Sequence, residues 1–266
     1  MAIIKKETNG VVYHASEAFA AAGGVVHGFA SRLGGVSTGD FAQLNLGIKR
    51  DDSRENVREN YARFCAAIGA DRDSLVMTHQ VHSDDVRTAS RSDVLADLLD
   101  PIPYETDGLV TDEPGLCLVI YYADCIPVLL HDPRHHAVAA IHAGWRGTVA
   151  RIVRQTVQAM QARLGTLAAD LRAVIGPGIS LQAFEVGQEV YDAFLAAGFP
   201  MERIAVRHDK WHIDLWEANR LQLEEAGVQD IQMAGVCTYT HPDLYYSARR
   251  LGIQAGRILN GIMLRA

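Results

Sequence analysis

One cysteine and two histidines stand where chemistry could be carried out. Cys125 lies in the segment YADCIP, His142 opens the segment HAGWRG seventeen residues later, and His82 lies upstream in THQVHS. A cysteine with two histidines makes a three-ligand site for a soft-to-borderline metal and leaves one coordination position open for chemistry. The alternative is a nucleophilic Cys/His pair, and in either case the residues predict an enzyme.

The neighbours of Cys125 and His142 favour a turn at the end of a strand. Asp124 precedes the cysteine and Pro127 follows it, so the chain is expected to turn there. Two glycines follow His142 and let the backbone approach a ligand closely, and a helix after them would direct free N–H groups at an anion. A turn that needs its glycines, with His142 bonded to the backbone, stays open as the structural alternative.

The remaining cysteines and His79 are weaker candidates. His79 lies three residues before His82 in a strand-like segment, so the two side chains should point to opposite sides and only one should reach the site. Cys65 falls on the apolar stripe of an expected helix and Cys117 lies within LCLV, so both are interpreted as core residues. Cys237, in GVCT at a strand end, fits either interpretation.

Arg32 and the pair Arg249-Arg250 are candidate anion contacts. Arg32, in the glycine-rich piece RLGGVS, could hold a phosphate or a carboxylate. Arg249 and Arg250 follow the segment YYSA and form a second candidate, with a solvated surface pair as the alternative. The chain contains no GxGxxG, no Walker loop and no HExxH, so the common nucleotide and zinc-protease motifs do not explain it.

Length and composition are those of a soluble globular protein. The 266 residues are 48% hydrophobic and 21% charged, which is ample for a core that holds a buried site. Lys and Arg number 25 against 32 Asp and Glu, and the net charge of −7 disfavours non-specific nucleic-acid binding. The longest apolar run, 115–130, contains Asp124 and Pro127 and is too short to span a bilayer.

The location and partners follow from the same features. The N-terminal residues contain no apolar core of a signal peptide, and the four cysteines are far apart without a CxxC. A reducing, cytoplasmic location is therefore expected. The expected partner is a small-molecule substrate, with no nucleic acid and no membrane, and the oligomeric state stays open.

The elements that must position these residues alternate between helix and strand. Neither a linker nor a repeat is visible, so residues 1–266 are expected to form a single domain. Several strands are apolar without alternation, which indicates sheets covered on both faces, and the turn 132–135 predicts a hairpin and hence mixed sheets. The fold class is layered α/β or α+β, with the site at strand ends. Helices are expected at 52–69, 149–164, 186–197 and 214–226, and strands at 108–111, 116–121, 127–131, 137–142 and 171–175.

The motifs, taken together, resemble a known family over 27–257, nearly the whole chain. The segments are HGFASRLGGVS, LNLG, QVHS, DGLVT, YYADCIPVLLHD, VAAIHAGWRGT, VIGPGIS, FEVGQEV and YSARR, in that order. They resemble the bacterial multicopper polyphenol oxidoreductase (laccase-like) family. That family is also described as zinc-dependent purine nucleoside phosphorylases and includes the peptidoglycan editing factor. The resemblance implies a four-layer α/β/β/α sandwich.

Residue by residue, the resemblance places the family's metal ligands on His82, Cys125 and His142, the same three residues. Two positions depart from the family pattern: Gly178 stands where a cysteine is common, and Ala248 fills a slot before the Arg-Arg pair. A multicopper oxidase needs a cluster of many further histidines, and the 11 histidines here include no HxH pair. A single zinc ion therefore suits the chain better, with copper as the alternative metal.

The favoured hypothesis is a zinc-dependent purine nucleoside phosphorylase acting on adenosine, inosine or methylthioadenosine, with adenosine deamination as a further activity. Cys125, His142 and Asp124 are the catalytic candidates, and Arg32, Asp107 and Arg249 are the candidates for substrate or phosphate. Either aspartate could instead orient a ligand histidine or relay a proton. The alternatives are a copper-dependent polyphenol oxidase, a Cys–His hydrolase that edits peptidoglycan precursors, and a metal-stabilised binding protein without enzymatic activity.

Overall fold

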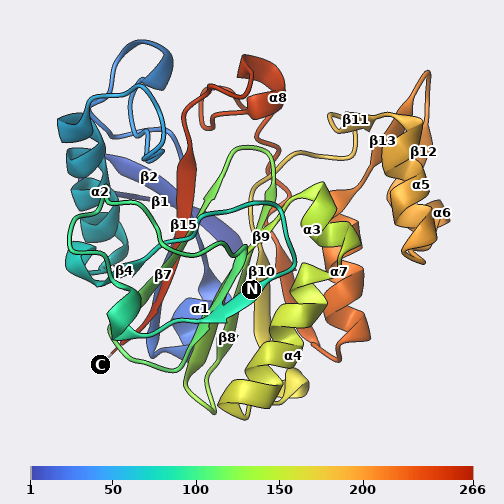
Figure 1. The fold of residues 1–266 in the computed structure, drawn as a ribbon, viewed down its shortest axis with the longest axis horizontal. Helices are drawn as coiled ribbons and strands as arrows, with labels where there is room; N and C mark the ends of the chain where they lie inside the picture. The colour runs from blue at the N-terminus through green and yellow to red at the C-terminus, as the bar shows by residue number, and fades with distance from the viewer. Residues whose placement is uncertain (1, 266) are drawn as a thin grey trace.

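Two stacked sheets form the centre of the computed structural model, which describes residues 2–265 (Figure 1). The first sheet has six strands in the order β1-β2-β3-β15-β7-β4. Its strands are antiparallel except for the edge pair β4 and β7. The bounds are β1 Ile3–Thr8, β2 Val11–Ser16, β3 Val25–Ala30, β4 Leu75–Val76, β7 Cys117–Tyr122 and β15 Ile258–Leu264.

The second sheet also has six strands, in the order β14-β10-β8-β9-β6-β5. It is mixed: the pairs β5 with β6 and β10 with β14 are parallel, and the others are antiparallel. The turn predicted at 132–135 joins β8 and β9 as a hairpin. The bounds are β5 Val86–Thr88, β6 Gly108–Thr111, β8 Ile126–Asp132, β9 Ala137–Ala143, β10 Arg172–Ile175 and β14 Asp230–Met233.

Helices cover the outer face of each sheet. Helix α2 (Arg54–Ile68) packs on the first sheet, and α4 (Ile152–Leu164) and α7 (Leu215–Glu225) pack on the second (Figure 1). A third apolar cluster lies between the two sheets and contains buried side chains of both, such as Leu118 and Leu129. Because the central strands are buried on both faces, their sequences lack alternation. The four-layer α/β/β/α arrangement is therefore confirmed.

Helix α2 forms where its sequence pattern predicts. Ser53 caps it by accepting the backbone N–H of Asn56, and Gly69 ends it in the left-handed conformation with φ 78°. The cap is thus Ser53, while Asp52 accepts hydrogen bonds from Ser37 and Asn45 in the neighbouring loop. Cys65 on this helix and Cys117 on β7 are both buried core residues, as expected.

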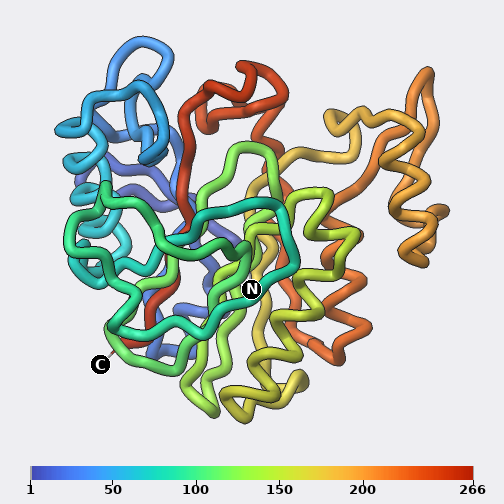
Figure 2. Tube along the Cα trace, viewed as in Figure 1, coloured from blue at the N-terminus to red at the C-terminus, as the bar shows by residue number. Residues whose placement is uncertain are grey.

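The other predicted helices differ in detail. The helix expected at 149–164 is two helices, α3 (Trp145–Val149) and α4, because Arg151 adopts φ 67° between them. The segment 186–197 begins with a short strand before its helix, and it belongs to a small three-stranded sheet in the order β11-β13-β12. This part stands out from the body in Figure 2. It comprises β11 Glu185–Val186, α5 Gln188–Ala196, α6 Met201–Ile204, β12 Ala205–Arg207 and β13 Trp211–Ile213.

The remaining helical segments are short. Within residues 2–265, no helix is long and apolar enough to cross a membrane. The segments are α1 Glu17–Ala22 and α8 Ala248–Leu251, with 3-10 turns η1 Gly39–Phe41, η2 Arg72–Ser74, η3 Arg91–Asp93 and η4 Ala168–Asp170.

Candidate metal centre

The β8–β9 hairpin brings the cysteine and one histidine together. Its register pairs Ile126 with Ala143 and Pro127 with His142, so Cys125 in the preceding turn comes to lie beside Gly144. The loop between β4 and β5 supplies His82 from the other side. Strand ends from both sheets therefore place side chains that are far apart in the sequence around one point.

The three predicted ligands converge. The ligand atoms of His82, Cys125 and His142 all lie within 4.8 Å of one another, and this is the one such group of three among residues 2–265. The Sγ of Cys125 is 3.9 Å from the Nε2 of His82. His142 is buried, whereas the side chain of His82 is exposed, so the group is open to solvent on the His82 side.

Asp107 organises both histidines. Its Oδ1 accepts a hydrogen bond from Nδ1 of His142 at 2.7 Å. Its Oδ2 accepts the backbone N–H groups of Val81 at 3.0 Å and Ser83 at 2.8 Å, which flank His82. The Ser83 hydroxyl adds a bond at 3.0 Å to the same oxygen. One buried carboxylate thus orients one ring directly and fixes the backbone on both sides of the other, as such carboxylates do behind metal ligands.

Charge and hydrogen bonding shift the ionisation of this group. Burial alone would raise the pKa of the Cys125 thiol, but the charge of His142 and hydrogen bonds from both histidines lower it. Burial opposes the positive charge on His142, yet Cys125 and Asp107 together raise the pKa of its ring. Asp107 is affected likewise: despite burial, the hydrogen bond and charge of His142 and the Ser83 and Val81 amides lower its pKa. The geometry therefore favours a thiolate that faces a protonated imidazole when no metal intervenes.

Gly144 is the residue that leaves room for the group. A Cβ at this position would lie 2.8 Å from Cδ2 of His82 and 3.1 Å from Sγ of Cys125. The glycines after His142 were predicted to allow a close approach, and here the approaching atoms are the two other ligand side chains.

Asp124 occupies a different environment from Asp107. Its backbone is left-handed with φ 85°, and its carboxylate accepts hydrogen bonds from Thr238 at 2.6 Å, Ser247 at 2.9 Å and the Arg249 amide at 2.7 Å. These bonds connect the Cys125 turn to α8 and to the segment after β14. The histidine-orienting bond that the sequence allowed for either aspartate is made by Asp107.

A pocket of about 480 Å³ opens in front of the three ligands. Apolar and aromatic side chains share its wall with basic ones, and among residues 2–265 no aspartate or glutamate contributes to the lining. The residues that line it are Gly47, Ile48, Lys49, Arg50, Thr78, His79, Gln80, His82, Tyr121, Tyr122, Ala123, Cys125, His142, Ala248, Ile253 and Arg257.

The two arginines predicted to contact an anion lie elsewhere. Arg32 donates to the carbonyl oxygens of Ala42 and Pro242 and stacks on Tyr246, outside the described lining. Arg249 is exposed and donates to the carbonyl oxygen of Glu185 at 2.7 Å. Neither Arg32 nor Arg249 is among the residues that line the pocket, so the anion contact expected at each of them stays a prediction.

Three basic residues that do line the pocket, Lys49, Arg50 and Arg257, were not predicted from the sequence. Their signal was modest: the first two follow the LNLG motif as GIKR, and the third follows Gly256 just before β15. The expectation that only one of the two upstream histidines reaches the ligand group agrees with the geometry. His82 joins the group, and His79 lines the pocket wall.

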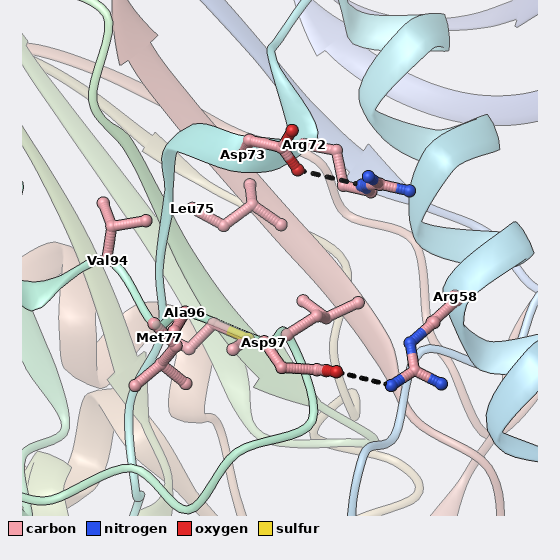
Figure 3. A pocket seen from close by; sticks show the side chains of 10 residues that line it. Arg58, Arg72, Asp73, Leu75, Met77, Val94, Ala96 and Asp97 are labelled. Atoms are coloured by element: carbon pink, nitrogen blue, oxygen red, sulfur yellow. Dashed lines mark hydrogen bonds and ion pairs between the residues drawn. The ribbon is translucent and has the colours of Figure 1, made fainter.

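A second hollow of about 220 Å³ lies between α2, the η2 turn and the loop 94–98 (Figure 3). It contains none of the three ligands. Its two arginines are each paired with a carboxylate, Arg58 with Asp97 at 2.6 Å and Arg72 with Asp73 at 3.1 Å. Because its charges are paired and its described residues contain no ligand group, this hollow is set aside, and the pocket in front of the three ligands is the candidate site.

Comparison with known proteins agrees with this assignment of the fold. A purine nucleoside phosphorylase from Bacteroides thetaiotaomicron is 45% identical over 251 residues, which cover 90% of this chain and 92% of that protein. Adenosine deaminase RL5, from an unknown prokaryotic organism, is 37% identical over 84% of this chain and 87% of its own length. The crystal structure of YlmD from Geobacillus stearothermophilus superposes with a TM-score of 0.91 at 32% identity, and the match covers 100% of both chains. The model of one family, the multi-copper polyphenol oxidoreductase laccases, matches residues 26–265, and the chain belongs to that family.

Proposed function

We propose that the protein is a metal-dependent purine nucleoside phosphorylase that acts on adenosine, inosine or methylthioadenosine. The observation that carries the proposal is that one pocket holds both a three-ligand group and a basic wall. Relatives named purine nucleoside phosphorylase support the substrate class. In the reaction a phosphate oxygen bonds to C1′ of the ribose while the C1′–N9 bond breaks. Its electron pair goes to N9, which takes up a proton, and ribose 1-phosphate and the free base are released.

The donor set fits a zinc ion. Zinc bonds of about 2.0–2.3 Å in a tetrahedron place neighbouring ligand atoms about 3.5 Å apart. The 3.9 Å between Sγ of Cys125 and Nε2 of His82 is close to that value. His82, Cys125 and His142 would hold the ion, which when bound supplies a Lewis acid in the pocket. Copper is the alternative metal, since thiolate and imidazole suit both ions.

The chain's own residues prepare the site for this reaction. Asp107 holds the proton of His142 on Nδ1, which leaves Nε2 directed toward the pocket. Gln80 bonds both backbone groups of Tyr121, each at 2.8 Å, and so fixes the loop that carries His82 against β7. The apolar side chains of Ile48, Tyr121 and Ile253 offer surface for a purine base.

The test is release of hypoxanthine from inosine by protein loaded with zinc, with and without phosphate. We expect release that requires phosphate and that stops after treatment with a chelator. Release that is equally fast without phosphate would indicate hydrolysis. No base release from inosine, adenosine or methylthioadenosine would contradict the proposal.

Deamination of adenosine is a second candidate activity of the same pocket. Its support is the relative named adenosine deaminase, which matches 84% of this chain, together with the open coordination position of a three-ligand site. Formation of inosine from adenosine in phosphate-free buffer tests it directly, because phosphorolysis cannot proceed there.

A Cys–His hydrolase is the third candidate, because the surroundings of Cys125 lower the pKa of its thiol. Here Cys125 would be the nucleophile and His142 the base, and a peptidoglycan precursor would be the substrate. Activity that survives chelation and is lost on alkylation with iodoacetamide would favour this reading. Protection of the thiol by added zinc, with activity that depends on the metal, would favour the phosphorylase. Oxidation of a polyphenol by copper-loaded protein tests the remaining alternative.

A further inference from the structure

We infer that Arg50 and Arg257, assisted by Lys49, form the subsite that binds the phosphate co-substrate. The inference deepens the proposed function and rests on it. Both arginines line the pocket that holds His82, Cys125 and His142, although more than 200 positions separate them in the sequence. Arg50 comes from the loop before α2, and Arg257 directly precedes β15.

The backbone at Gly47 allows the two arginines to lie side by side. A Cβ on Gly47 would be 2.9 Å from Cγ of Arg50 and 3.2 Å from Cβ of Arg257. The stems of both side chains therefore pass over the same glycine. Burial and then the charge of Arg50 lower the pKa of Arg257 to about 10, which leaves it protonated at neutral pH.

No carboxylate of the described residues forms a direct ion pair with this wall, and Asp51 and Asp124 act on Arg50 and Arg257 only at longer range. Within residues 2–265, the ion pairs with carboxylates include none from Lys49, Arg50 or Arg257. Among the described residues, the pocket lining contains three cationic side chains, Lys49, Arg50 and Arg257, and no aspartate or glutamate. The net charge of the whole chain is −7. The pocket is thus a local positive region in an acidic protein, a setting that attracts an anion.

The guanidinium of Arg257 is held in place by neutral acceptors. Its Nη1 donates to the carbonyl oxygens of Ala255 at 2.6 Å and Gly256 at 3.1 Å, and its Nη2 donates to Ile253 at 3.0 Å. Carbonyl oxygens orient the group without cancelling its charge. Arg50 makes a long contact of 3.5 Å with Gln254, so its donors are available to a ligand.

The hollow of Figure 3 shows the opposite arrangement. There Arg58 and Arg72 face Asp97 and Asp73, and the four charges sum to zero. A dianion gains from two adjacent guanidinium groups that no carboxylate neutralises, and it gains little where each is already paired. Inorganic phosphate is therefore assigned to the Arg50–Arg257 wall.

The experiment compares Arg50→Gln and Arg257→Lys with the matched control Arg58→Gln. Inorganic phosphate is the probe in two measurements: the rise in melting temperature that phosphate produces, and the separate KM values for phosphate and inosine. Arg50→Gln should raise the KM for phosphate by about 10- to 100-fold, the cost of a lost hydrogen bond to a charged group, and leave the KM for inosine nearly unchanged. Arg257→Lys keeps the charge but loses the fork, so a smaller rise is expected. Arg58→Gln should match the unmodified protein in both measurements.

The two measurements separate this inference from the proposed function. If inosine is cleaved with phosphate and Arg50→Gln keeps the KM for phosphate, the subsite assignment is wrong while the proposed function stands. If no nucleoside is cleaved, but phosphate stabilises the unmodified protein and not Arg50→Gln, the anion subsite stands and the proposed function fails. If phosphate stabilises neither protein, or stabilises both equally, the subsite is refuted. Melting temperatures without phosphate verify that each variant is folded.

Discussion

Asp107 and Asp124 are two buried carboxylates near the candidate metal centre, and they have different hydrogen-bond partners. Asp107 accepts four hydrogen bonds, all from His142 and from the loop that carries His82. Asp124 accepts three, from Thr238, Ser247 and the Arg249 amide. The first therefore acts on the ligands and the second on the scaffold behind Cys125. Burial and bond number alone do not distinguish the two roles; the identity of the donors does.

The largest effect is expected at the thiol of Cys125. Cys125→Ala should lose stoichiometric metal and activity, because the thiolate is the anionic member of the ligand group and two neutral imidazoles remain. Cys65→Ala, a buried cysteine on α2, is the control and should cost on the order of 1 kcal/mol of unfolding free energy with metal retained. Elemental analysis of both purified variants measures the difference. Full zinc content in Cys125→Ala would mean that the metal is held elsewhere.

The next largest effect tests the comparison itself. Asp107→Asn should weaken metal binding by about 10- to 100-fold, as is typical when a carboxylate behind a ligand histidine is removed. Asp124→Asn should leave metal affinity within a few-fold. It should instead lower the unfolding free energy by about 1.5–3 kcal/mol, through weakened charge-assisted hydrogen bonds. Competition with a metal-binding dye and urea unfolding give the two values. Equal losses of metal affinity in both variants would remove the distinction.

A smaller effect is expected at Gly144. The methyl group of Gly144→Ala would meet the His82 ring and the Cys125 sulfur, and the exposed His82 is the one that can move. Metal affinity should fall by about tenfold, which is comparable to disturbing a ligand's support. The unfolding free energy should change little, because the His82 ring is exposed and can move into solvent without losing core packing. The same dye competition measures it, and an unchanged affinity would show that the ring is not held in the position seen here.

The smallest effect concerns histidines that lack a carboxylate partner. Burial, followed by the charge of Arg172, lowers the pKa of His131 to about 4 from 6.5, whereas Asp107 helps to raise that of His142. Between pH 6.5 and about pH 4, His131 binds a proton in the unfolded chain but not in the folded chain. The free energy of unfolding therefore decreases as pH falls below 6.5. The loss is up to about 1.4 kcal/mol per pH unit for one histidine. His131→Phe should reduce the slope of unfolding free energy against pH by that amount, which urea unfolding at a series of pH values measures; an unchanged slope would contradict the assignment to His131.

Much of the fold and the ligand group could be predicted because both depend on local patterns. Apolar runs without alternation predict covered sheets, and a turn of known length fixes the register that places Cys125 beside Gly144. The resemblance supplied the order of the layers, which periodicity alone could not give. By contrast, the helix break at Arg151 depends on a left-handed residue that no glycine or proline marks.

The hydrogen-bond partners of the carboxylates near the ligands could not be predicted from the sequence, for a physical reason. Whether a carboxylate meets a ring or a hydroxyl depends on which distant segments pack against it, as with Ser247 and Asp124. Arg32 was predicted from its glycine-rich neighbours, yet in the fold its guanidinium donates to the carbonyls of Ala42 and Pro242 and lies outside the pocket lining. Arg50 and Arg257 meet only because β15 returns to the first sheet from the far end of the chain.

The uneven burial of the three ligands sets an order for metal exchange. His142 is enclosed and held by Asp107, while His82 faces solvent on a loop whose backbone at that residue has φ 63°. An incoming ion would meet His82 first, and a departing ion would lose it first. Cys125 and His142 would hold a bound ion from the enclosed side of the group, and His82 from the accessible side. Loop 78–83 would then control how fast a chelator removes the ion, independently of how tightly the ion binds.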